Sequence, residues 1–287
     1  MVERLPDLAA DAERVARAAL DEDGTRDVTT ELVLTAPRLA GATLEYRRGG
    51  VVAGLRYATA AARLAGCAAT WQAREGDWIE GSGGRLEGDL SAILRAERPL
   101  LNLLQRATGI ATATRSYVAA VAGTACRVLH TRKTAPGLRL FDAAAVVAGG
   151  GAVHRLDLSQ TVMIKDNHWR ALRATGRTLV QARDAARQRG AGGFQVEVES
   201  LAQVEEACAA GADRLLVDNQ DPDTVARWAR RARELFPPVL IEATGGITLE
   251  TVRAYAAAGA DFISVGALTH SVRAADIALT LERKTPS

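Results

Sequence analysis

Aromatic residues are scarce in this chain, and their scarcity limits how a core is built and what a surface binds. Of 287 residues only 4% are aromatic, whereas 48% are hydrophobic and 24% are charged. A core therefore has to be assembled from Ala, Val, Leu and Ile in closely packed strands and helices, and the chain is long enough for one large core or two smaller ones. A surface on which single-stranded nucleic acid stacks its bases is not expected.

Runs of one charge sign and long apolar runs are also missing. Thirty-six Lys and Arg residues stand against 34 Asp and Glu residues, which leaves a net charge of +2 without a Lys/Arg-rich segment. We therefore expect no nucleic-acid partner, and any concentration of positive charge has to be local to a site. No apolar stretch approaches the roughly 20 residues that span a bilayer, and the N-terminal segment has no hydrophobic signal core, so a soluble, cytoplasmic protein without a membrane partner is expected.

Cysteine is rare as well. Cys67, Cys126 and Cys208 are widely spaced, form no CxxC motif and lie in Ala- or Val-rich settings. This pattern predicts buried, reduced thiols in a cytoplasmic protein.

The first part of the chain has the hydrophobic pattern of a mixed α/β domain. Residues 7–20 carry apolar positions at helical spacing, with Asp7 placed as a cap, and short alternating runs broken by Gly between Gly41 and Glu87 predict antiparallel strands. Further helices are expected near residues 56–66, over 90–122 with an interruption near Thr108 and Gly109, and over 274–283, where the chain packs back on the first domain.

Six short β-branched runs follow, and Ala/Arg-rich helical segments separate them. They lie at residues 126–130, 161–165, 194–199, 214–218, 238–243 and 261–266. This alternation predicts a parallel sheet, and six units favour a barrel over the alternative of an open doubly wound sheet. No GxGxxG occurs at the first strand-to-helix turn, which weakens a dinucleotide-binding interpretation. We expect an N-terminal domain over residues 1–113, joined by 274–287, and a catalytic barrel domain over 114–273.

Charged and small residues follow each predicted strand, where the loops of a barrel meet at one mouth. The cations there are Arg132, Lys133, His154, Arg155 and Lys165. Because such a group repels itself unless an anion neutralises it, the sequence predicts a substrate with several negative charges. Any one of these residues alone would be interpreted as a solvated surface charge.

Acidic and glycine-containing strand ends complete the predicted site. Glu197 and Glu199 alternate onto one face of their strand, and Asp218 ends the next strand. Carboxylates there suit a positive charge developing on a sugar ring, or Mg²⁺ held through a pyrophosphate, while an ion pair with a barrel lysine stays open for Glu199. Phosphate-binding loops are expected at Thr244-Gly245-Gly246 and Gly266-Ala267. Among the histidines, His154 and His270 are the better ligand contacts, and His130 and His168 are supporting residues.

Several of these segments resemble quinolinate phosphoribosyltransferases. The similarity runs from about residue 15 to residue 280, and TRKTxPG and IKDNH are its most specific parts. The matching segments are Glu97-Arg98, Asn102 to Arg106, Gly109 to Thr112, Thr131 to Arg139, Gly149 to Gly151 with His154-Arg155, Ile164 to His168, Val196 to Glu199, Val217 to Asn219 and Glu242 to Ile247.

The resemblance implies an N-terminal α/β sandwich domain and a C-terminal incomplete α/β barrel of the TIM type. It also implies a homodimer in which the sandwich of one subunit covers the barrel mouth of the other. The implied activity is transfer of phosphoribosyl from phosphoribosyl pyrophosphate to quinolinate, with Mg²⁺. Its products are nicotinate mononucleotide, pyrophosphate and CO₂, as in NAD biosynthesis.

The resemblance also assigns roles to single residues. Lys133, Glu197 and Asp218 are the implied catalytic residues, and the two carboxylates are the implied Mg²⁺ contacts through pyrophosphate. Arg98 reaches the partner's site. The implied substrate-binding set is Arg98, Thr131, Arg132, Lys133, His154, Arg155, Lys165, Glu197, Asp218, Thr244, Gly245, Gly246, Gly266, Ala267 and His270. In it Arg132, His154, Arg155 and Lys165 match dicarboxylate contacts, Lys133 a pyrophosphate contact, and the residues from Thr244 onwards the 5′-phosphate loops with His270 nearby.

Four departures from the family pattern stand out. Arg26-Asp27-Val28 replaces a Gly-Asp-Ile segment, His130 stands where Asp is common, and Val153 where Asn is common. Residues 141–149 are AAAVV-rich where the family often has Lys and Arg. Most of these changes cluster near the dicarboxylate pocket, so they bear on the identity of the acceptor.

Three alternatives to the quinolinate-type transferase stay open. One is a molybdenum-transport-associated member of the superfamily that acts on another acceptor. A second is a barrel lyase that forms a Schiff base on Lys165, and a third is a phosphate-binding protein without catalytic activity. Retention of IKDNH and of Asn102-Leu103-Leu104-Gln105 favours the quinolinate type.

Overall fold

The computed structural model describes residues 4–282. Within it the chain forms two compact units, one of Ser116–Arg132 and Ala152–Gly266, and one of Arg4–Arg115, Lys133–Gly151 and 267–282. The domains expected from the sequence, 1–113 with 274–287 and 114–273, stay predictions, and residues 283–287 lie outside the described range. Among the described residues no helix combines the length and the apolar character needed to cross a bilayer.

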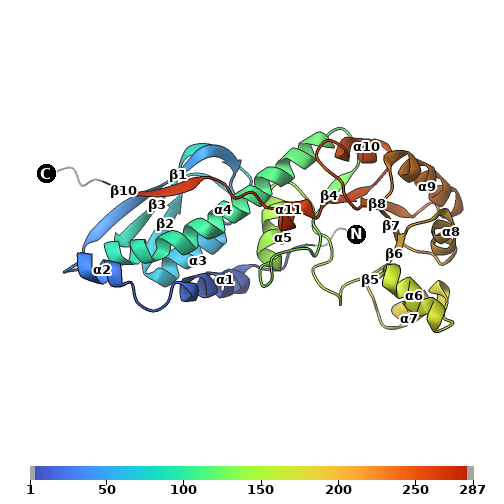
Figure 1. The fold of residues 1–287 in the computed structure, drawn as a ribbon, viewed down its shortest axis with the longest axis horizontal. Helices are drawn as coiled ribbons and strands as arrows, with labels where there is room; N and C mark the ends of the chain where they lie inside the picture. Colours follow the sequence, from blue (N-terminus) through green and yellow to red (C-terminus); the bar gives the residue numbers. More distant parts are fainter. Residues whose placement is uncertain (1–3, 283–287) are drawn as a thin grey trace. The chain divides into compact units, whose positions relative to one another are not determined.

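The unit that contains Arg4–Arg115 has a four-stranded antiparallel sheet (Figure 1). Along β1, Ala42, Leu44 and Tyr46 are buried and alternate with more exposed residues, as expected for a strand with one face in a core. The antiparallel strands predicted between Gly41 and Glu87 are therefore confirmed. In sheet order the strands are β10 (Ile277–Leu281), β1 (Leu39–Val51), β3 (Trp78–Asp89) and β2 (Cys67–Trp71).

The predicted helix over residues 274–283 is wrong. Residues 277–281 form β10, which pairs with β1 from Ala42 opposite Leu281 to Tyr46 opposite Ile277. A short run such as IALTL fits a helix or a strand equally well by its periodicity. The edge of β1 decides between them, because it presents backbone donors and acceptors that a fourth strand satisfies.

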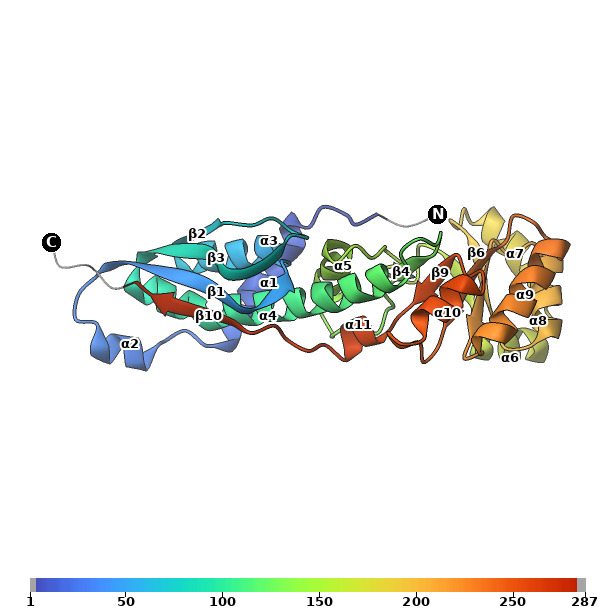
Figure 2. The same cartoon turned by 90° about the horizontal axis from the view of Figure 1, so that it is seen from above.

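Helices pack along this sheet (Figure 2). Helix α1 (Ala9–Glu22) has Leu8, not the expected Asp7, at its N-cap position, and Leu8 makes no side-chain capping bond. Asp7 lies one residue earlier, where its Oδ1 accepts a hydrogen bond from the Ala9 N–H at 3.2 Å. The predicted helix near residues 56–66 is α3 (Leu55–Ala65). The other helices with residues in this unit are α2 (Val28–Val33), α4 (Leu90–Ala120, which continues beyond Arg115), α5 (Arg139–Ala148) and α11 (Ala267–His270).

The expected interruption of the long helix near Thr108 and Gly109 is wrong. Helix α4 runs without a break from Leu90 to Ala120. A Cβ placed on Gly109 would lie 2.2 Å from the carbonyl oxygen of Arg273. The glycine therefore allows another segment to approach the helix closely, and it does not end the helix.

The unit that contains Ala152–Gly266 has a six-stranded, wholly parallel sheet, and all six predicted strands are confirmed. The edge strands β4 and β5 are not paired with each other in the described residues, which agrees with an incomplete barrel. In sheet order the strands are β4 (Arg127–Leu129), β9 (Phe262–Ser264), β8 (Leu240–Thr244), β7 (Arg214–Asp218), β6 (Phe194–Val198) and β5 (Val162–Ile164). Besides the last residues of α4, this unit contains the helices α6 (Asp166–Ala174), α7 (Leu179–Gln188), α8 (Leu201–Ala209), α9 (Pro222–Leu235) and α10 (Val252–Ala257).

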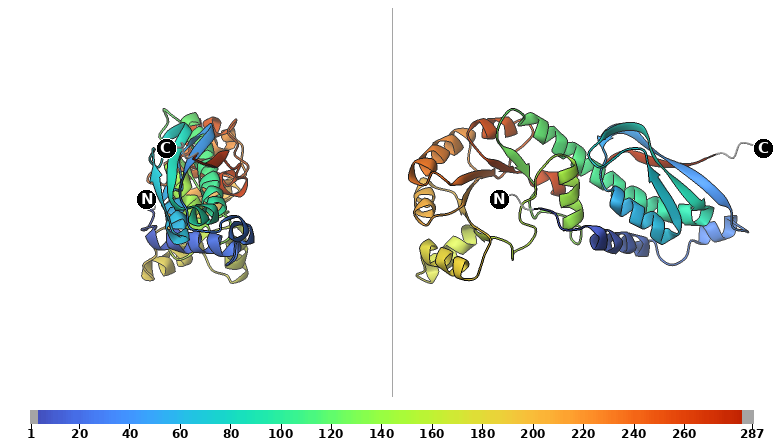
Figure 3. Two further views of the ribbon diagram at one scale, coloured as in Figure 1. Left: turned by 90° about the vertical axis from the view of Figure 1, so that its left-hand side faces the viewer. Right: turned by 180° about the vertical axis from the view of Figure 1, so that it is seen from behind.

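The two faces of this sheet differ in chemistry. On the outer face Val196, Leu215 and Ile241 form one core cluster with Val204 of α8 and Val225 of α9, which are both fully buried. Figure 3 shows these helices along the outside of the parallel sheet. Because side chains alternate along a strand, the residues between them face the inner side. Charged residues there have to find partners within the protein or in a ligand.

The three cysteines are free and buried, as predicted. Burial raises the pKa of each thiol, that of Cys126 to about 12. At neutral pH these side chains are therefore uncharged core residues and weak nucleophiles.

Candidate active site

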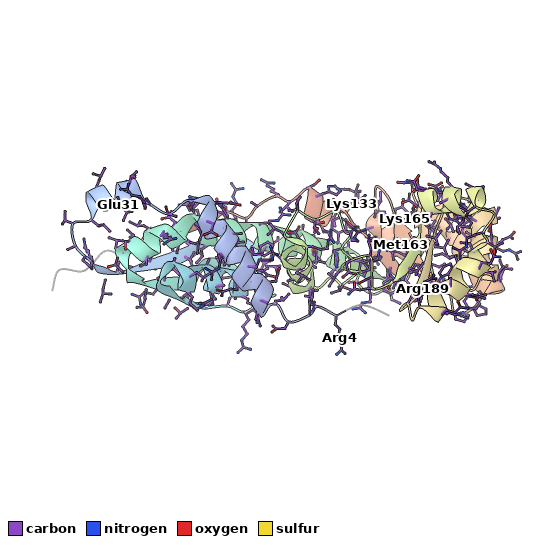
Figure 4. The ribbon with its side chains drawn as sticks, turned by 90° about the horizontal axis from the view of Figure 1, so that it is seen from below. Arg4, Glu31, Lys133, Met163, Lys165 and Arg189 are labelled. Atoms are coloured by element: carbon purple, nitrogen blue, oxygen red, sulfur yellow. The ribbon has the colours of Figure 1, made fainter. Side chains whose placement is uncertain are left out.

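Three ionisable residues lie together at the carboxyl ends of neighbouring strands. Lys165 follows β5, Glu197 lies in β6 and Asp218 ends β7 (Figure 4 labels Lys165 with Met163 of β5). The Lys165 Nζ forms an ion pair with Glu197 Oε2, although the lysine side chain is 42% exposed and the glutamate side chain only 8% exposed. The Trp169 Nε1–H donates to the Glu197 carbonyl at 2.8 Å, which ties α6 to the end of β6.

The negative charge of Glu197 acts on Asp218. The pKa of Asp218 is raised, first by burial and then by the negative charge of Glu197, while Lys165 acts in the opposite direction. Two neighbouring carboxylates repel each other unless a positive group lies close to them. The site thus favours a cation, either a metal ion or a substrate atom that becomes positive.

Glu199 does not share the environment of Glu197. Strand β6 ends at Val198, and Glu199 beyond it is exposed, with its N–H donating to Gln203 Oε1 at 2.8 Å. The ion pair with a barrel lysine that was open for Glu199 is made by Glu197 instead.

The predicted cations gather only in part within this unit. Arg155 and His154 are both 7% exposed, whereas Arg132 is exposed. The pKa of Arg155 is lowered, first by burial and then by the nearby charge of Arg132, and Glu242 and Glu197 oppose this shift. The charges of Arg132 and Glu197 therefore both act on Arg155, while the anion pocket proposed for these cations stays a prediction.

A buried ion-pair network on the inner face escaped the sequence reasoning. Glu242, 1% exposed, accepts from Arg214 Nη1 at 2.9 Å and from Ser264 Oγ at 2.5 Å, and its Oε1 lies 3.2 Å from His154 Nε2. Burial by itself raises the pKa of Glu242, but His154, Arg214 and Ser264 outweigh burial and lower it to about 2. The guanidinium of Arg214 also lies 4.1 Å from the ring centroid of Phe262. An acid and a base inside the otherwise apolar strands RLLVD and LIEAT were the signal that could have revealed this network.

His154 belongs to this network as well as to the predicted dicarboxylate pocket. Its Nδ1 accepts from the Arg155 N–H at 2.6 Å. Its backbone N–H donates to His130 Nε2 at 3.1 Å, and His130 is fully buried. His168 Nδ1 accepts from the Lys165 N–H at 3.0 Å. The supporting roles expected for His130 and His168 are therefore confirmed.

A cavity of about 470 Å³ lies towards the amino ends of these strands. It shares His154 and Arg155 with the predicted pocket but not Lys165, Glu197 or Asp218. Its lining residues are Val153, His154, Arg155, Gln160, Thr161, Gly192, Gly193, Gln195, Asp213, Arg214 and Leu240.

The predicted phosphate loop after β8 combines a crowded glycine and an open one. A Cβ on Gly245, where φ is +90°, would lie 2.2 Å from Asn219 Oδ1, whereas a Cβ on Gly246, where φ is +60°, would meet nothing within 4 Å. Thr244 ends β8 and accepts from the Asn219 N–H at 2.9 Å. The open glycine leaves backbone accessible to a ligand, as a phosphate loop needs.

Four predicted site residues belong to the other compact unit. Arg98 is exposed on α4, Lys133 is exposed after Arg132, and Ala267 and His270 begin and end α11. The His270 Nδ1 lies 2.7 Å from Ser271 Oγ. Thr131 and Gly266 belong to the unit with the parallel sheet.

The donor set available for a metal is small. Within residues 4–282, no group of three or more His, Cys, Asp or Glu residues is placed to hold a metal ion. Glu197 and Asp218 offer two carboxylates, which suits Mg²⁺ because this ion commonly takes its remaining ligands from water and substrate phosphates.

Comparison with known proteins gives consistent matches over most of the chain. Residues 110–280 match the quinolinate phosphoribosyl transferase C-terminal domain, and residues 27–108 match the corresponding N-terminal domain. A nicotinate-nucleotide pyrophosphorylase (carboxylating) from Mycobacterium leprae is 38% identical over 287 residues, covering 96% of this chain and 100% of that protein. A probable enzyme of the same name from Bacillus subtilis is 44% identical over 195 residues, covering 68% of this chain and 65% of that protein.

Solved structures agree with this match. The nicotinate-nucleotide pyrophosphorylase of Francisella tularensis superposes with a TM-score of 0.88 at 30% identity, covering 97% of this chain and 98% of that one. The parallel sheet, the charged residues at its carboxyl ends and both domain matches lead to one assignment: the chain belongs to the quinolinate phosphoribosyl transferase family.

Proposed function

We propose that the protein transfers the phosphoribosyl group of phosphoribosyl pyrophosphate to quinolinate and releases CO₂. The products are nicotinate mononucleotide and pyrophosphate, a step of NAD biosynthesis. The observation that carries the proposal is the pair of carboxylates beside Lys165 and Arg155, with Glu197 nearly buried and Asp218 partly buried. Such a site suits a dicarboxylate that reacts with a sugar carbon while that carbon becomes positive.

The acceptor needs cations that hold two carboxylates at fixed positions. Arg132, His154, Arg155 and Lys165 are the proposed contacts, and the planar guanidinium groups suit bidentate binding of a carboxylate. Held in this way, the ring nitrogen faces C1 of the ribose, and orientation replaces a bimolecular encounter.

The steps of the proposed reaction follow from the charges that develop on the sugar ring and on the pyridine ring. The bond between C1 and the pyrophosphate oxygen breaks, and its electrons leave with pyrophosphate, which Lys133 contacts. The positive sugar ring that results is stabilised by Glu197 and Asp218, and the ring-nitrogen lone pair forms the new bond to C1. The ring nitrogen is now cationic, so the 2-carboxylate leaves as CO₂, its bonding electrons stay on C2, and a proton from water completes the product.

Mg²⁺ is the proposed cofactor. Glu197 and Asp218 would hold it together with the pyrophosphate, where it would neutralise negative charge on the leaving group. The 5′-phosphate is proposed to bind the backbone of Thr244, Gly245, Gly246, Gly266 and Ala267, with His270 nearby.

The direct test is to incubate the purified protein with quinolinate, phosphoribosyl pyrophosphate and Mg²⁺ and to follow CO₂ and nicotinate mononucleotide. Stoichiometric formation of both supports the proposal. Turnover only with another acceptor would point to the molybdenum-transport-associated type. Borohydride trapping of substrate on Lys165 would point to a lyase, and binding without pyrophosphate release would point to a non-catalytic protein.

The active unit is proposed to be a homodimer in which Arg98 of one subunit enters the site of the other. Arg98→Ala and Glu197→Ala should each abolish most activity. Mixed by subunit exchange, the two variants should recover up to about a quarter of wild-type activity, because a random exchange restores one intact site in half of the dimers. Activity that stays at the level of either variant after verified exchange would contradict shared sites. Free, buried cysteines support a cytoplasmic location.

A further inference from the structure

Lys133 is exposed, yet the backbone around it is held by buried groups of the same compact unit. Arg106 on α4 binds Asp142 on α5 through two hydrogen bonds, Nε at 2.8 Å and Nη2 at 2.7 Å. The Asp142 side chain is fully buried, and that of Arg106 is 26% exposed. This bidentate, charge-assisted pair is rigid because the planar guanidinium can donate two hydrogen bonds to one carboxylate in only one geometry.

The pair also holds the turn that follows Lys133. Asp142 Oδ2 accepts from the Ala135 N–H at 3.1 Å, and Leu138 N–H closes the turn by donating to the Ala135 carbonyl at 3.0 Å. A carboxylate that binds both a guanidinium and a backbone N–H fixes the turn relative to α4 and α5.

The same arginine reaches the segment that carries His270. Arg106 Nη2 donates to the Thr269 carbonyl at 3.2 Å, and the Thr269 Oγ1–H donates to the Lys133 carbonyl at 2.9 Å. Thr269 is 2% exposed. The bonds therefore form a closed circuit from Arg106 through Asp142 to the Lys133 turn, and through Thr269 back to Arg106.

The two segments that this circuit joins carry Lys133 and His270, which have anion-binding roles in the proposed function. Lys133 and His270 are exposed, whereas Asp142 and Thr269 are buried and offer no surface to a substrate. The buried members can act only through the exposed ones.

We propose that three residues, Arg106, Asp142 and Thr269, are positioning residues. They hold Lys133 and His270 at fixed positions relative to each other, so that both can bind the phosphate-bearing ends of phosphoribosyl pyrophosphate. The inference rests on the proposed function. An error of about 1 Å in placing such groups lowers the rate by about 100-fold, although no substrate contact is lost.

The test is a series of substitutions that keep side-chain volume. Thr269→Val removes the hydroxyl donor, and we expect the KM for phosphoribosyl pyrophosphate to rise by about fivefold or more, the effect of one lost hydrogen bond, with the KM for quinolinate nearly unchanged. Thr269→Ser keeps the donor and should restore wild-type values. Thr114→Val is the matched control, because Thr114 is also fully buried and donates to a backbone carbonyl, that of Ile110 at 2.8 Å, outside the circuit.

Arg106→Lys and Asp142→Asn test the ion pair itself. Each should lower kcat/KM for phosphoribosyl pyrophosphate by about 100-fold, since the bidentate geometry is lost. If either variant fails to fold, the Thr269 and Thr114 pair still decides the question. Equal rises in both KM values, or a Thr269→Val enzyme indistinguishable from Thr114→Val, would overturn the proposal.

Lysine chemistry supplies a readout that does not need turnover. Lys133, Lys165 and Lys284 are the only lysines of the chain. Inorganic pyrophosphate with Mg²⁺ should protect Lys133 from an amine-reactive reagent, measured by mass spectrometry, and about fivefold more pyrophosphate should be needed in Thr269→Val. If the wild-type protein makes no nicotinate mononucleotide, the proposed function fails, whereas unchanged protection in Thr269→Val counts against the positioning circuit alone.

Discussion

Glu197→Gln should lower kcat by about 100- to 1,000-fold, the range observed when a preorganised electrostatic contact to a transition state is removed. The carboxylate is nearly buried, and Lys165 holds it beside Asp218. Glutamine keeps the shape and accepts a hydrogen bond from Lys165, but it carries no charge to set against a positive sugar ring. Steady-state kinetics with both substrates at saturation measure the effect.

Two comparisons separate this effect from a loss of structure. Glu199→Gln, two residues further along the chain, removes an exposed carboxylate and should change kcat by less than about twofold. The midpoint of chemical unfolding of Glu197→Gln should stay close to that of the wild type, because Lys165 remains 42% exposed and regains water. Equal losses of kcat in the two variants would remove Glu197 from the proposed mechanism.

Arg214→Met should reduce the free energy of unfolding by about 3–5 kcal/mol, the effect of breaking a buried ion pair from one side. The substitution leaves Glu242 fully enclosed, with His154 and Ser264 as its remaining polar partners. Contact with the Phe262 ring is lost as well. Urea unfolding at pH 7 measures the difference.

Arg231→Met is the matched control for this loss. Arg231 pairs with Glu205 at 2.9 Å on the surface, where both side chains are more than 40% exposed, so we expect about 0–1 kcal/mol. The double variant Arg214→Met with Glu242→Gln should recover part of the loss, since no charged group is then left alone in the core. If Arg214→Met lowered the free energy of unfolding by only about 0–1 kcal/mol, as expected for the surface pair, the buried network would contribute little to stability.

The low pKa of Glu242 predicts how the network responds to acid. Its folded-state pKa of about 2 lies below the ordinary value near 4.5. The stability that it contributes is therefore complete above about pH 4.5 and declines as the pH falls towards 2. The difference in unfolding free energy between wild type and Glu242→Gln should shrink over the same interval.

The sequence predicted the parallel strands well because each is a short β-branched run bounded by helical segments. For the same reason it correctly placed Glu197 and Asp218 on neighbouring strands of the sheet, while their catalytic role stays a prediction. It failed for residues 277–281 and for Gly109, where the decisive partner is the edge of β1 or the backbone of Arg273. Local periodicity carries no information about such distant partners.

The amino-acid order alone determined which residue types stand at the carboxyl end of each strand, and through TRKTxPG and IKDNH it determined the family. Only the tertiary structure decided which of these groups are paired. Lys165 forms an ion pair with Glu197, and Arg106 forms one with Asp142. Glu242 contacts Arg214, Ser264 and His154. The reason is physical: a charge withdrawn from water has to find its partner in space, and the partner is supplied by packing between segments far apart in the chain.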